Sequence, residues 1–290
     1  MEKDEFESRY LNPLTDFGFH RLFGTESCKE LLIDFLNGII KEEGLITDIQ
    51  YLPPEQWGYS KSDRRAIFDI FCINEKGEYF IVEMQKAKQP YFRERSIFYT
   101  TLPLQKQAPR GVWNFNLKAV YLVAVLDFVL FNEFEADKEH VIEYVNLVRR
   151  RTNTLYSKTM NFVFVELPKF RKTENELVSN ADKWLFVLKN LSQLKERPVA
   201  LQGNIFEMLF QLAEINKLTK EDMREYRKSI LQYRDVRDAV DLARDEGREE
   251  GIEKERASII RKCLQNNIPI EVIVNLTSLP KEEIIQFTNK

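Results

Sequence analysis

The sequence is poor in cysteine and histidine, and both shortages exclude kinds of site. Its three cysteines, Cys28, Cys72 and Cys263, are widely spaced and form no Cys-x-x-Cys motif. This spacing argues against a zinc ribbon or a disulfide scaffold and suits a reducing compartment. The only histidines are His20 and His140, so a histidine-rich metal site or a serine-histidine-aspartate triad has little material.

Long apolar runs are lacking as well. No segment approaches the ~20 consecutive apolar residues that span a bilayer. The first ten residues, MEKDEFESRY, are charged and contain no apolar core of a signal peptide. We therefore expect a soluble, cytoplasmic protein that does not bind membranes. Its net charge of −3 argues, for the chain as a whole, against a simple nucleic-acid coat protein.

The chain does contain enough apolar material for a large core. Of its 290 residues, 43% are hydrophobic and 21 are phenylalanine, which excludes global disorder. Hydrophobic patterning predicts strands over 46–52, 66–73, 78–85, 117–126, 141–148 and 160–167. The apolar run over 117–126 predicts a central strand that is covered on both faces. It predicts helices over 26–40, 91–107, 180–194 and 219–266, followed by two short helical pieces within 268–287.

This order of elements predicts an α/β domain followed by a mostly helical C-terminal part. We expect a core over 1–170, a helical extension packing on it over 171–218, and a charged long helix with a small helical tail over 219–290. Residues 234–256 hold six basic and nine acidic residues, a pattern typical of a solvated or interdomain helix. Assembly of a homo-oligomer through these C-terminal helices is a further expectation.

One predicted hairpin, residues 66–85, carries a polar pair in apolar surroundings. Asp69 interrupts a strand that is otherwise apolar on both faces, and a carboxylate there is costly without a partner. A loop over 75–77 would place Gly77 at the left-handed position that such loops favour. Counting back along both strands then puts Asp69 opposite Glu83, whereas a shift by one residue would put them on opposite faces.

Two facing carboxylates repel one another, and a divalent cation removes that repulsion. Mg²⁺ prefers a few carboxylate oxygens together with water and substrate phosphate. Gln85 follows on the same face as Glu83, where its amide can orient a water or contact a phosphate. The arrangement suits metal-assisted phosphodiester hydrolysis. The alternative is a structural pair of carboxylates bound to lysine or arginine, and the spacing alone does not separate the two.

A basic segment follows the hairpin directly. From Met84 to Lys118 the chain has one acidic residue, Glu94, and seven basic ones: Lys86, Lys88, Arg93, Arg95, Lys106, Arg110 and Lys118. In an acidic protein, such a segment beside a carboxylate pair favours contacts with a polyanion. A solvated helix face is the alternative, because charge runs are weak motifs by themselves.

Several motifs together resemble the Rpn family of recombination-promoting nucleases, the PD-(D/E)XK nuclease family transposases. They are TDFGFHRLFG at 15–24, Phe68-Asp69-Ile70, Val82-Glu83-Met84-Gln85 followed by Arg95 and Tyr99, Glu-Leu-Pro-Lys-Phe at 166–170, and Gly-Arg-Glu-Glu-Gly at 247–251. The resemblance extends through most of the chain. It departs where the superfamily's usual lysine is Gln85 and where the family's early lysine is His20.

The resemblance implies a restriction-endonuclease-like α/β fold, a mixed sheet with flanking helices, and Mg²⁺-dependent cleavage of DNA with Mn²⁺ as an alternative metal. Links to mobile elements, recombination or defence are implied with it. Asp16 is either a further metal-binding or positioning carboxylate or an N-cap. The competing hypothesis is a nuclease-like fold that binds DNA or protein without cutting. The predicted residues are Asp69, Glu83, Gln85 and Asp16 for catalysis, Asp69 and Glu83 as metal ligands, and Lys86, Lys88, Arg93, Arg95 and Tyr99 for DNA binding.

Overall fold

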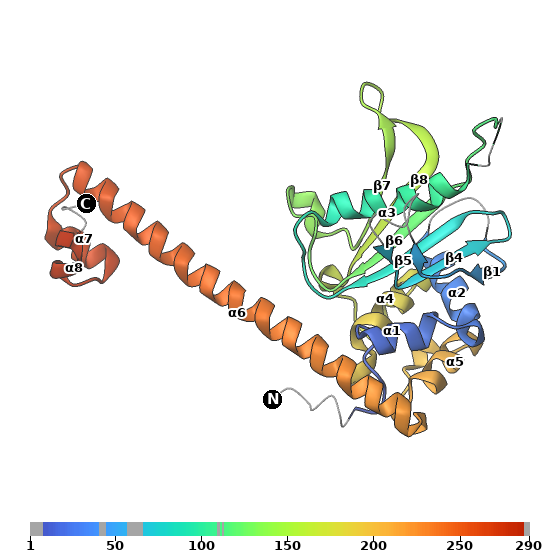
Figure 1. The fold of residues 1–290 in the computed structure, drawn as a ribbon. Coiled ribbons are helices and arrows are strands. Elements are labelled where there is room, and N and C mark those ends of the chain that lie inside the picture. Colours follow the sequence, from blue (N-terminus) through green and yellow to red (C-terminus); the bar gives the residue numbers. More distant parts are fainter. Residues whose placement is uncertain (1–7, 41–44, 57–65, 109–110, 112, 287–290) are drawn as a thin grey trace. The chain divides into compact units, whose positions relative to one another are not determined.

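A computed structural model of the chain describes residues 8–40, 45–56, 66–108, 111 and 113–286 (Figure 1). The chain forms two compact units, residues 1–234 and 235–290. Among the described helices, none is long and apolar enough to cross a membrane. Arg110 of the basic segment lies outside the described residues.

The first unit is built on a mixed sheet of six strands in the order β1-β4-β5-β6-β8-β7. β5, β6 and β8 are parallel to one another, and the other pairings, β1 with β4, β4 with β5 and β7 with β8, are antiparallel. The strands are β1 (Ile49–Tyr51), β4 (Ile70–Asn74), β5 (Tyr79–Gln85), β6 (Val120–Leu126), β7 (Ile142–Arg149) and β8 (Thr154–Glu166), and a separate pair consists of β2 (Glu55–Gln56) and β3 (Ala66–Ile67).

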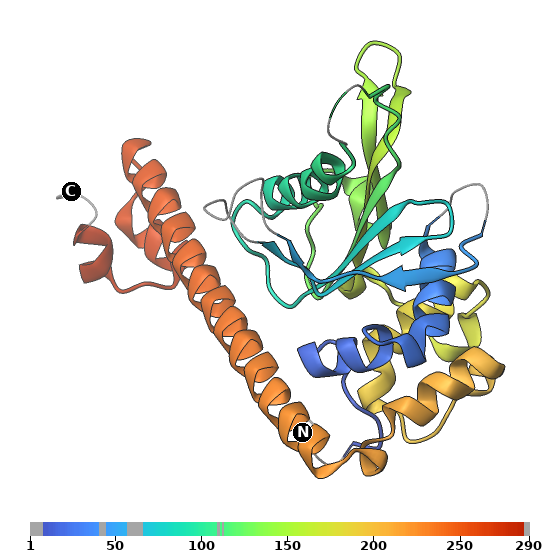
Figure 2. The same ribbon diagram turned by 45° about the vertical axis from the view of Figure 1, so that its right-hand side comes forward.

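Helices cover both faces of this sheet (Figures 1 and 2). One face carries α3 (Phe92–Lys106), and the opposite face carries α1, α2, α4, α5 and the start of α6. The bounds are α1 (Asp16–Phe23), α2 (Lys29–Ile39), α4 (Asn180–Asn190), α5 (Asn204–Ala213) and α6 (Lys220–Gln265). Short 3-10 helices lie between them: η2 (Glu26–Cys28), η3 (Glu135–Lys138), η4 (Leu167–Lys169), η5 (Glu174–Glu176), η6 (Leu191–Gln193), η7 (Val199–Leu201) and η8 (Ile215–Lys217).

The central strands β5 and β6 are buried on both faces, as is typical of parallel strands that helices cover on both sides. All seven residues of β6 are buried, which confirms the prediction of a doubly covered strand over 117–126. Successive residues of β5 alternate between the two cores: Val82 and Met84 join the cluster under α1, whereas Ile81 joins the cluster under α3. This alternation directs the side chains of Glu83 and Gln85 to the α3 face.

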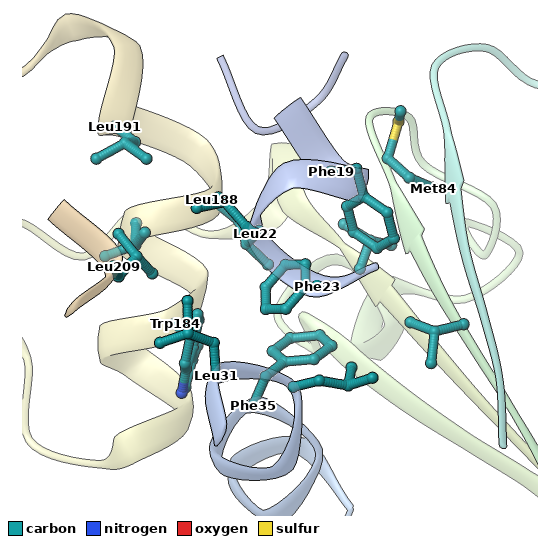
Figure 3. Close-up of a cluster of buried hydrophobic side chains, with 14 of the residues drawn as sticks. Phe19, Leu22, Phe23, Leu31, Phe35, Met84, Trp184, Leu188, Leu191 and Leu209 are labelled. Carbon is teal, nitrogen blue, oxygen red and sulfur yellow. The ribbon is translucent and has the colours of Figure 1, made fainter. Parts of the chain in front are cut away.

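Aromatic packing holds the helical layer to the sheet. Figure 3 shows Phe19 and Phe23 of α1 between strand residue Met84 and the indole of Trp184 in α4. The Phe23 ring centroid lies 5.6 Å from that of Trp184, and the Trp184 Nε1–H donates to Asp34 Oδ2 at 2.7 Å. The first residues of α1 therefore have a fixed position beside the carboxyl end of β5.

The start of α6 belongs to the first unit. Tyr226, Ile230 and Tyr233 are buried there, and the backbone N–H of Asn12 donates to the Tyr226 hydroxyl at 2.8 Å. The predicted boundary before residue 219 therefore differs from the structural one, which follows Arg234. Hydrophobic periodicity alone did not distinguish the buried first turns of this helix from its charged continuation.

The second unit contains the rest of α6 with α7 (Ile270–Thr277) and α8 (Lys281–Gln286). Residues 237–256 of α6 are exposed, in agreement with the solvated helix that their charges predict. Ile260, Ile273 and Ile284 form a small buried cluster that joins the three helices. The two short helical pieces predicted near the C-terminus are both present.

Candidate metal centre at the carboxyl end of β5

The predicted hairpin register is confirmed. Ile70 pairs with Val82, and at the turn the Asn74 N–H donates to the Glu78 carbonyl at 3.0 Å. Gly77 adopts a φ of 79°, the left-handed conformation that its place in the loop requires. Continuing this register one step beyond Ile70 brings Asp69 level with Glu83.

The strand predicted over 66–73 is, however, interrupted at Asp69. β3 ends at Ile67 and β4 begins at Ile70, with Asp69 in a bend between them. The backbone N–H of Met84 donates to Asp69 Oδ2 at 2.7 Å, so a side chain takes the place of a backbone ladder partner. Such side-chain bonds compete with the backbone hydrogen bonds of the sheet. Here the bond to Met84 holds the Asp69 carboxylate beside the end of β5.

Glu83 is buried, with 4% of its surface exposed. Its Oε2 accepts from Gln85 Nε2 at 3.1 Å, while its Oε1 has no hydrogen-bond partner among the described residues. Burial raises the pKa of Glu83 strongly, and the Asp69 charge raises it further; the Asp69 backbone, Arg95 and Gln85 act in the opposite direction. An unpartnered buried carboxylate oxygen is costly, and a cation would stabilise it.

Asp69 shares this environment. It keeps an exposed surface, but the protein around it excludes enough water to raise the pKa of its carboxyl group. The Met84 N–H lowers that pKa, the Asp16 charge raises it, and the charges of Lys86 and Arg95 lower it. The carboxylates of Asp69 and Glu83 therefore repel one another in a partly dehydrated place, as expected for two carboxylates that face each other across a hairpin.

Arg95 and Tyr99 reach this centre from α3. Arg95 Nη2 donates to Gln85 Oε1 at 2.8 Å, and the guanidinium also donates to Gln89. It lies 5.8 Å from the Tyr99 ring centroid, and the buried Nε of Arg95 has no partner in the described part of the chain. Burial and then the Glu83 charge raise the pKa of Tyr99. Residues 95 and 99, four apart on one helix, thus face the carboxylates together.

These bonds determine how the Gln85 amide is oriented. An arginine only donates, so the Gln85 oxygen faces Arg95 and its NH₂ group faces Glu83. Two hydrogen bonds in series therefore link Arg95 to Gln85 and Gln85 to Glu83. Gln89 accepts from the other end of the Arg95 guanidinium. The sequence analysis did not predict this contact, because no pattern marks a glutamine in the loop between β5 and α3.

Asp16 enters from the opposite helical layer. It is the first residue of α1 and bonds to Lys86, with 2.8 Å between Lys86 Nζ and Asp16 Oδ1. The interpretation of Asp16 as an N-cap is wrong, since the Thr15 side chain caps α1 by accepting from the Gly18 N–H at 3.0 Å. Both charges of this pair act on the pKa of Asp69, so Lys86 lies at the centre itself.

Three other residues that the sequence analysis considered lie outside this cluster, which consists of Asp16, Asp69, Glu83, Gln85, Lys86, Arg95 and Tyr99. Arg93 points away from it and pairs with Glu133 at 2.5 Å, since residues two apart on a helix do not share a face. Lys88 is exposed in the connection that follows β5. His20 is exposed one turn after Asp16, and its ring packs against Gly24.

The donor set suits a small, hard divalent cation. Carboxylate oxygens are the protein ligands that Mg²⁺ prefers. In the described part of the chain, no three or more His, Cys, Asp or Glu side chains gather to enclose an ion. Asp69 and Glu83 would therefore leave most coordination positions to water and substrate oxygens, which is the usual situation of a catalytic magnesium.

Comparison with known proteins gives one family match. A family model described as PD-(D/E)XK nuclease family transposase matches residues 13–243, a span that contains every residue of the cluster. Searches against curated proteins and against solved structures find no match.

Proposed function

Because the chain belongs to the PD-(D/E)XK nuclease family transposases, we propose that it is a Mg²⁺-dependent DNA endonuclease that hydrolyses phosphodiester bonds. The observation that carries the proposal is the buried Glu83, whose Oε1 has no hydrogen-bond partner among the described residues and which the hairpin register brings level with Asp69. Burial and mutual repulsion make this pair unfavourable in the absence of a cation. If the two carboxylates had a purely structural role, we would expect a lysine or arginine bonded directly to Glu83.

Each residue of the cluster has a role that follows from its contacts. Asp69 and Glu83 would hold the ion, which, when bound, polarises the scissile phosphate and lowers the pKa of a coordinated water. Gln85 donates to Glu83 Oε2, which would leave Oε1 available to the ion. Arg95 holds Gln85 in that orientation. Lys86 neutralises Asp16 and supplies the cluster with an ammonium group, one position after the place where the superfamily has its lysine.

The test is nicking of supercoiled plasmid by the purified full-length protein. We expect conversion to open-circular and linear DNA in the presence of Mg²⁺, a similar product with Mn²⁺, and no conversion with EDTA. DNA binding without nicking, in either metal and across pH 6 to 9, would instead support the alternative of a nuclease-like protein that binds without cutting. Retention on labelled duplex, measured in the same samples, separates these outcomes.

The two arginines of α3 should behave differently. Arg95→Gln breaks the chain to Gln85 and removes a charge that lowers the pKa of both carboxylates, so we expect the nicking rate to fall about 10- to 100-fold. The pH at which the rate rises should also shift upward. Arg93→Gln removes the same charge from the other side of the helix and should leave the rate within about threefold, an ordinary surface effect.

Initial nicking rates and pH–rate profiles of the two variants, with circular dichroism to confirm folding, check this expectation. Arg95→Lys serves as a further control, because a lysine keeps the charge but cannot bridge Gln85 and Gln89 as the planar guanidinium does. Equal rates for the Arg93 and Arg95 variants would contradict the assigned role of Arg95.

A further inference from the structure

The hairpin between β7 and β8 extends beyond the sheet as a two-stranded arm, residues 147–158 (Figures 1 and 2). β8 pairs with β6 only from Met160 to Glu166, so its first residues have β7 as their strand partner. This part of β8 was not predicted, because polar and apolar residues do not alternate regularly there. A two-stranded ribbon adds little to the stability of a core, and this one calls for another explanation.

The base of the arm is fixed by polar contacts. The register shifts on both sides of Leu147, which marks β-bulges where the ribbon leaves the sheet. Asn146 Nδ2 donates to the buried Asn161 at 2.7 Å, and Asn161 Nδ2 donates to the Lys158 carbonyl at 2.8 Å. The bend is therefore a built feature of the fold, which directs the arm away from the sheet.

The tip of the arm presents three consecutive arginines, residues 149–151. Arg149 pairs with Thr154, and the N–H of Asn153 donates to the Arg149 carbonyl at 2.8 Å. Asn153 takes a left-handed φ of 52°, which asparagine tolerates better than most residues. All three arginines are exposed, and within the described part of the chain their guanidinium groups have no ion-pair or hydrogen-bond partner.

The charge of the arm is of one sign. From Leu147 to Lys158 there are four basic residues and no acidic one, although the whole chain carries a net charge of −3. Unpaired arginines at the end of a narrow ribbon repel one another, and a partner rich in phosphate offsets that repulsion. The major groove of duplex DNA admits a two-stranded β-ribbon, and arginine contacts phosphates and base edges there.

We propose that this arm is a second DNA-contacting element, separate from the cutting centre, which binds the phosphates of duplex DNA through Arg149, Arg150 and Arg151. The proposal rests on the proposed function in taking DNA as the substrate. Glu83 lies level with Phe164 across the parallel strands, and ten residues separate Phe164 from Thr154 at the tip. At 3.3 Å per residue this is a reach of up to about 33 Å, or roughly ten base pairs.

A second copy of the chain is the competing occupant of the arm. Val148 and Tyr156 are exposed on it, and β7 is an edge strand of the sheet. Pairing of two arms, however, would bring their arginine tips or flanks together, and like charges facing one another across strands are destabilising. The charge thus favours DNA, and the oligomeric state enters the test as an outcome.

The test compares two full-length variants with matched charge changes. In the arm variant, Arg149, Arg150 and Arg151 are replaced by glutamine. In the control variant, Arg224, Arg227 and Lys228, exposed on the first turns of α6, are replaced by glutamine. The DNA is a 30-base-pair duplex labelled with fluorescein, about three times as long as the reach of the arm. Its binding is measured by fluorescence anisotropy in EDTA between 50 and 300 mM salt.

We expect the arm variant to bind at least about tenfold more weakly at low salt and to lower the slope of log affinity against log salt by about two to three. The control should change affinity less than about threefold. Equal binding by the arm variant and the wild type, or an equal loss in the control, would overturn the proposal, as would a change of oligomeric state in the arm variant by light scattering.

The outcomes distinguish this proposal from the nuclease function. Wild-type protein that nicks plasmid, with an arm variant that binds as tightly, refutes the arm alone. Wild-type protein that binds DNA without nicking, with an arm variant that loses affinity, refutes the nuclease function alone. Absence of wild-type binding at every salt concentration, together with absence of nicking, refutes both.

Discussion

Glu83→Gln and Asp69→Asn should each lower Mg²⁺-dependent nicking by more than about 100-fold, since even the loss of an outer-shell contact typically costs 10–100-fold in metal affinity or activity. Each substitution keeps the shape of the side chain and removes one charge from the pair that would hold the ion. Excess Mn²⁺ should restore part of the rate. Plasmid nicking at several metal concentrations measures both effects.

The same substitutions should raise the thermal stability of the metal-free protein at pH 8. The pKa values of Asp69 and Glu83 are raised in the folded protein, so the folded state binds protons more readily than the unfolded chain, in which these groups titrate near pH 4. The pair is therefore neutral at low pH, and stability is lost as pH rises through the folded pKa values. An amide avoids that loss, and we expect a Tm higher by about 2–4 °C per kcal/mol gained.

Glu166→Gln is the matched control for the predicted gain in thermal stability, because we expect the opposite effect. Glu166 is also a fully buried strand carboxylate, but Lys169 Nζ lies 2.5 Å from its Oε2 and the Phe131 N–H donates to its Oε1 at 3.0 Å. Removing its charge leaves a buried lysine unpaired and should lower stability by about 3–5 kcal/mol. Melting curves and nicking assays are to be made on the same preparations. Folded Asp69 and Glu83 variants that cleave at the wild-type rate would refute the assigned centre.

Truncation of the C-terminal part should give opposite results at two nearby positions. A chain that ends at Arg234 retains the buried residues of α6 and should fold with Mg²⁺-dependent activity. A chain that ends at Leu218 loses Tyr226, Ile230 and Tyr233, which are at most 6% exposed. Each buried side chain of this size contributes about 2–5 kcal/mol, and together they approach the total stability of a typical domain.

The shorter protein should therefore be insoluble or partly unfolded. It also loses the Tyr226 hydroxyl that binds the Asn12 N–H and the Ser229 hydroxyl that binds the Phe17 N–H, next to Asp16. Circular dichroism melts and size-exclusion chromatography of both truncations check the expectation. A soluble, cooperatively melting protein that ends at Leu218 would contradict the structural boundary. Light scattering of the chain ending at Arg234 tests, in addition, whether residues 235–290 support a homo-oligomer.

The sequence by itself determined most of the local structure and the pairing of β4 with β5, which brings Asp69 level with Glu83. Alternation and turn chemistry are short-range properties, so the loop ending at Gly77 was enough to set the hairpin register, and the continuous apolar run of β6 was enough to show a strand covered on both faces. The motif resemblance identified the nuclease family, and Glu83 and Gln85 were correctly placed on one face of β5.

Only the tertiary structure decided which charged residues meet. Asp16 and Lys86 are 70 positions apart and come together because α1 packs beside the end of β5. Arg93 and Arg95 looked equivalent in the basic segment, and helix packing turned only Arg95 toward the carboxylates. Long-range packing likewise drew the first turns of α6 into the core. Such contacts depend on how whole elements pack, and no local pattern of residues encodes them.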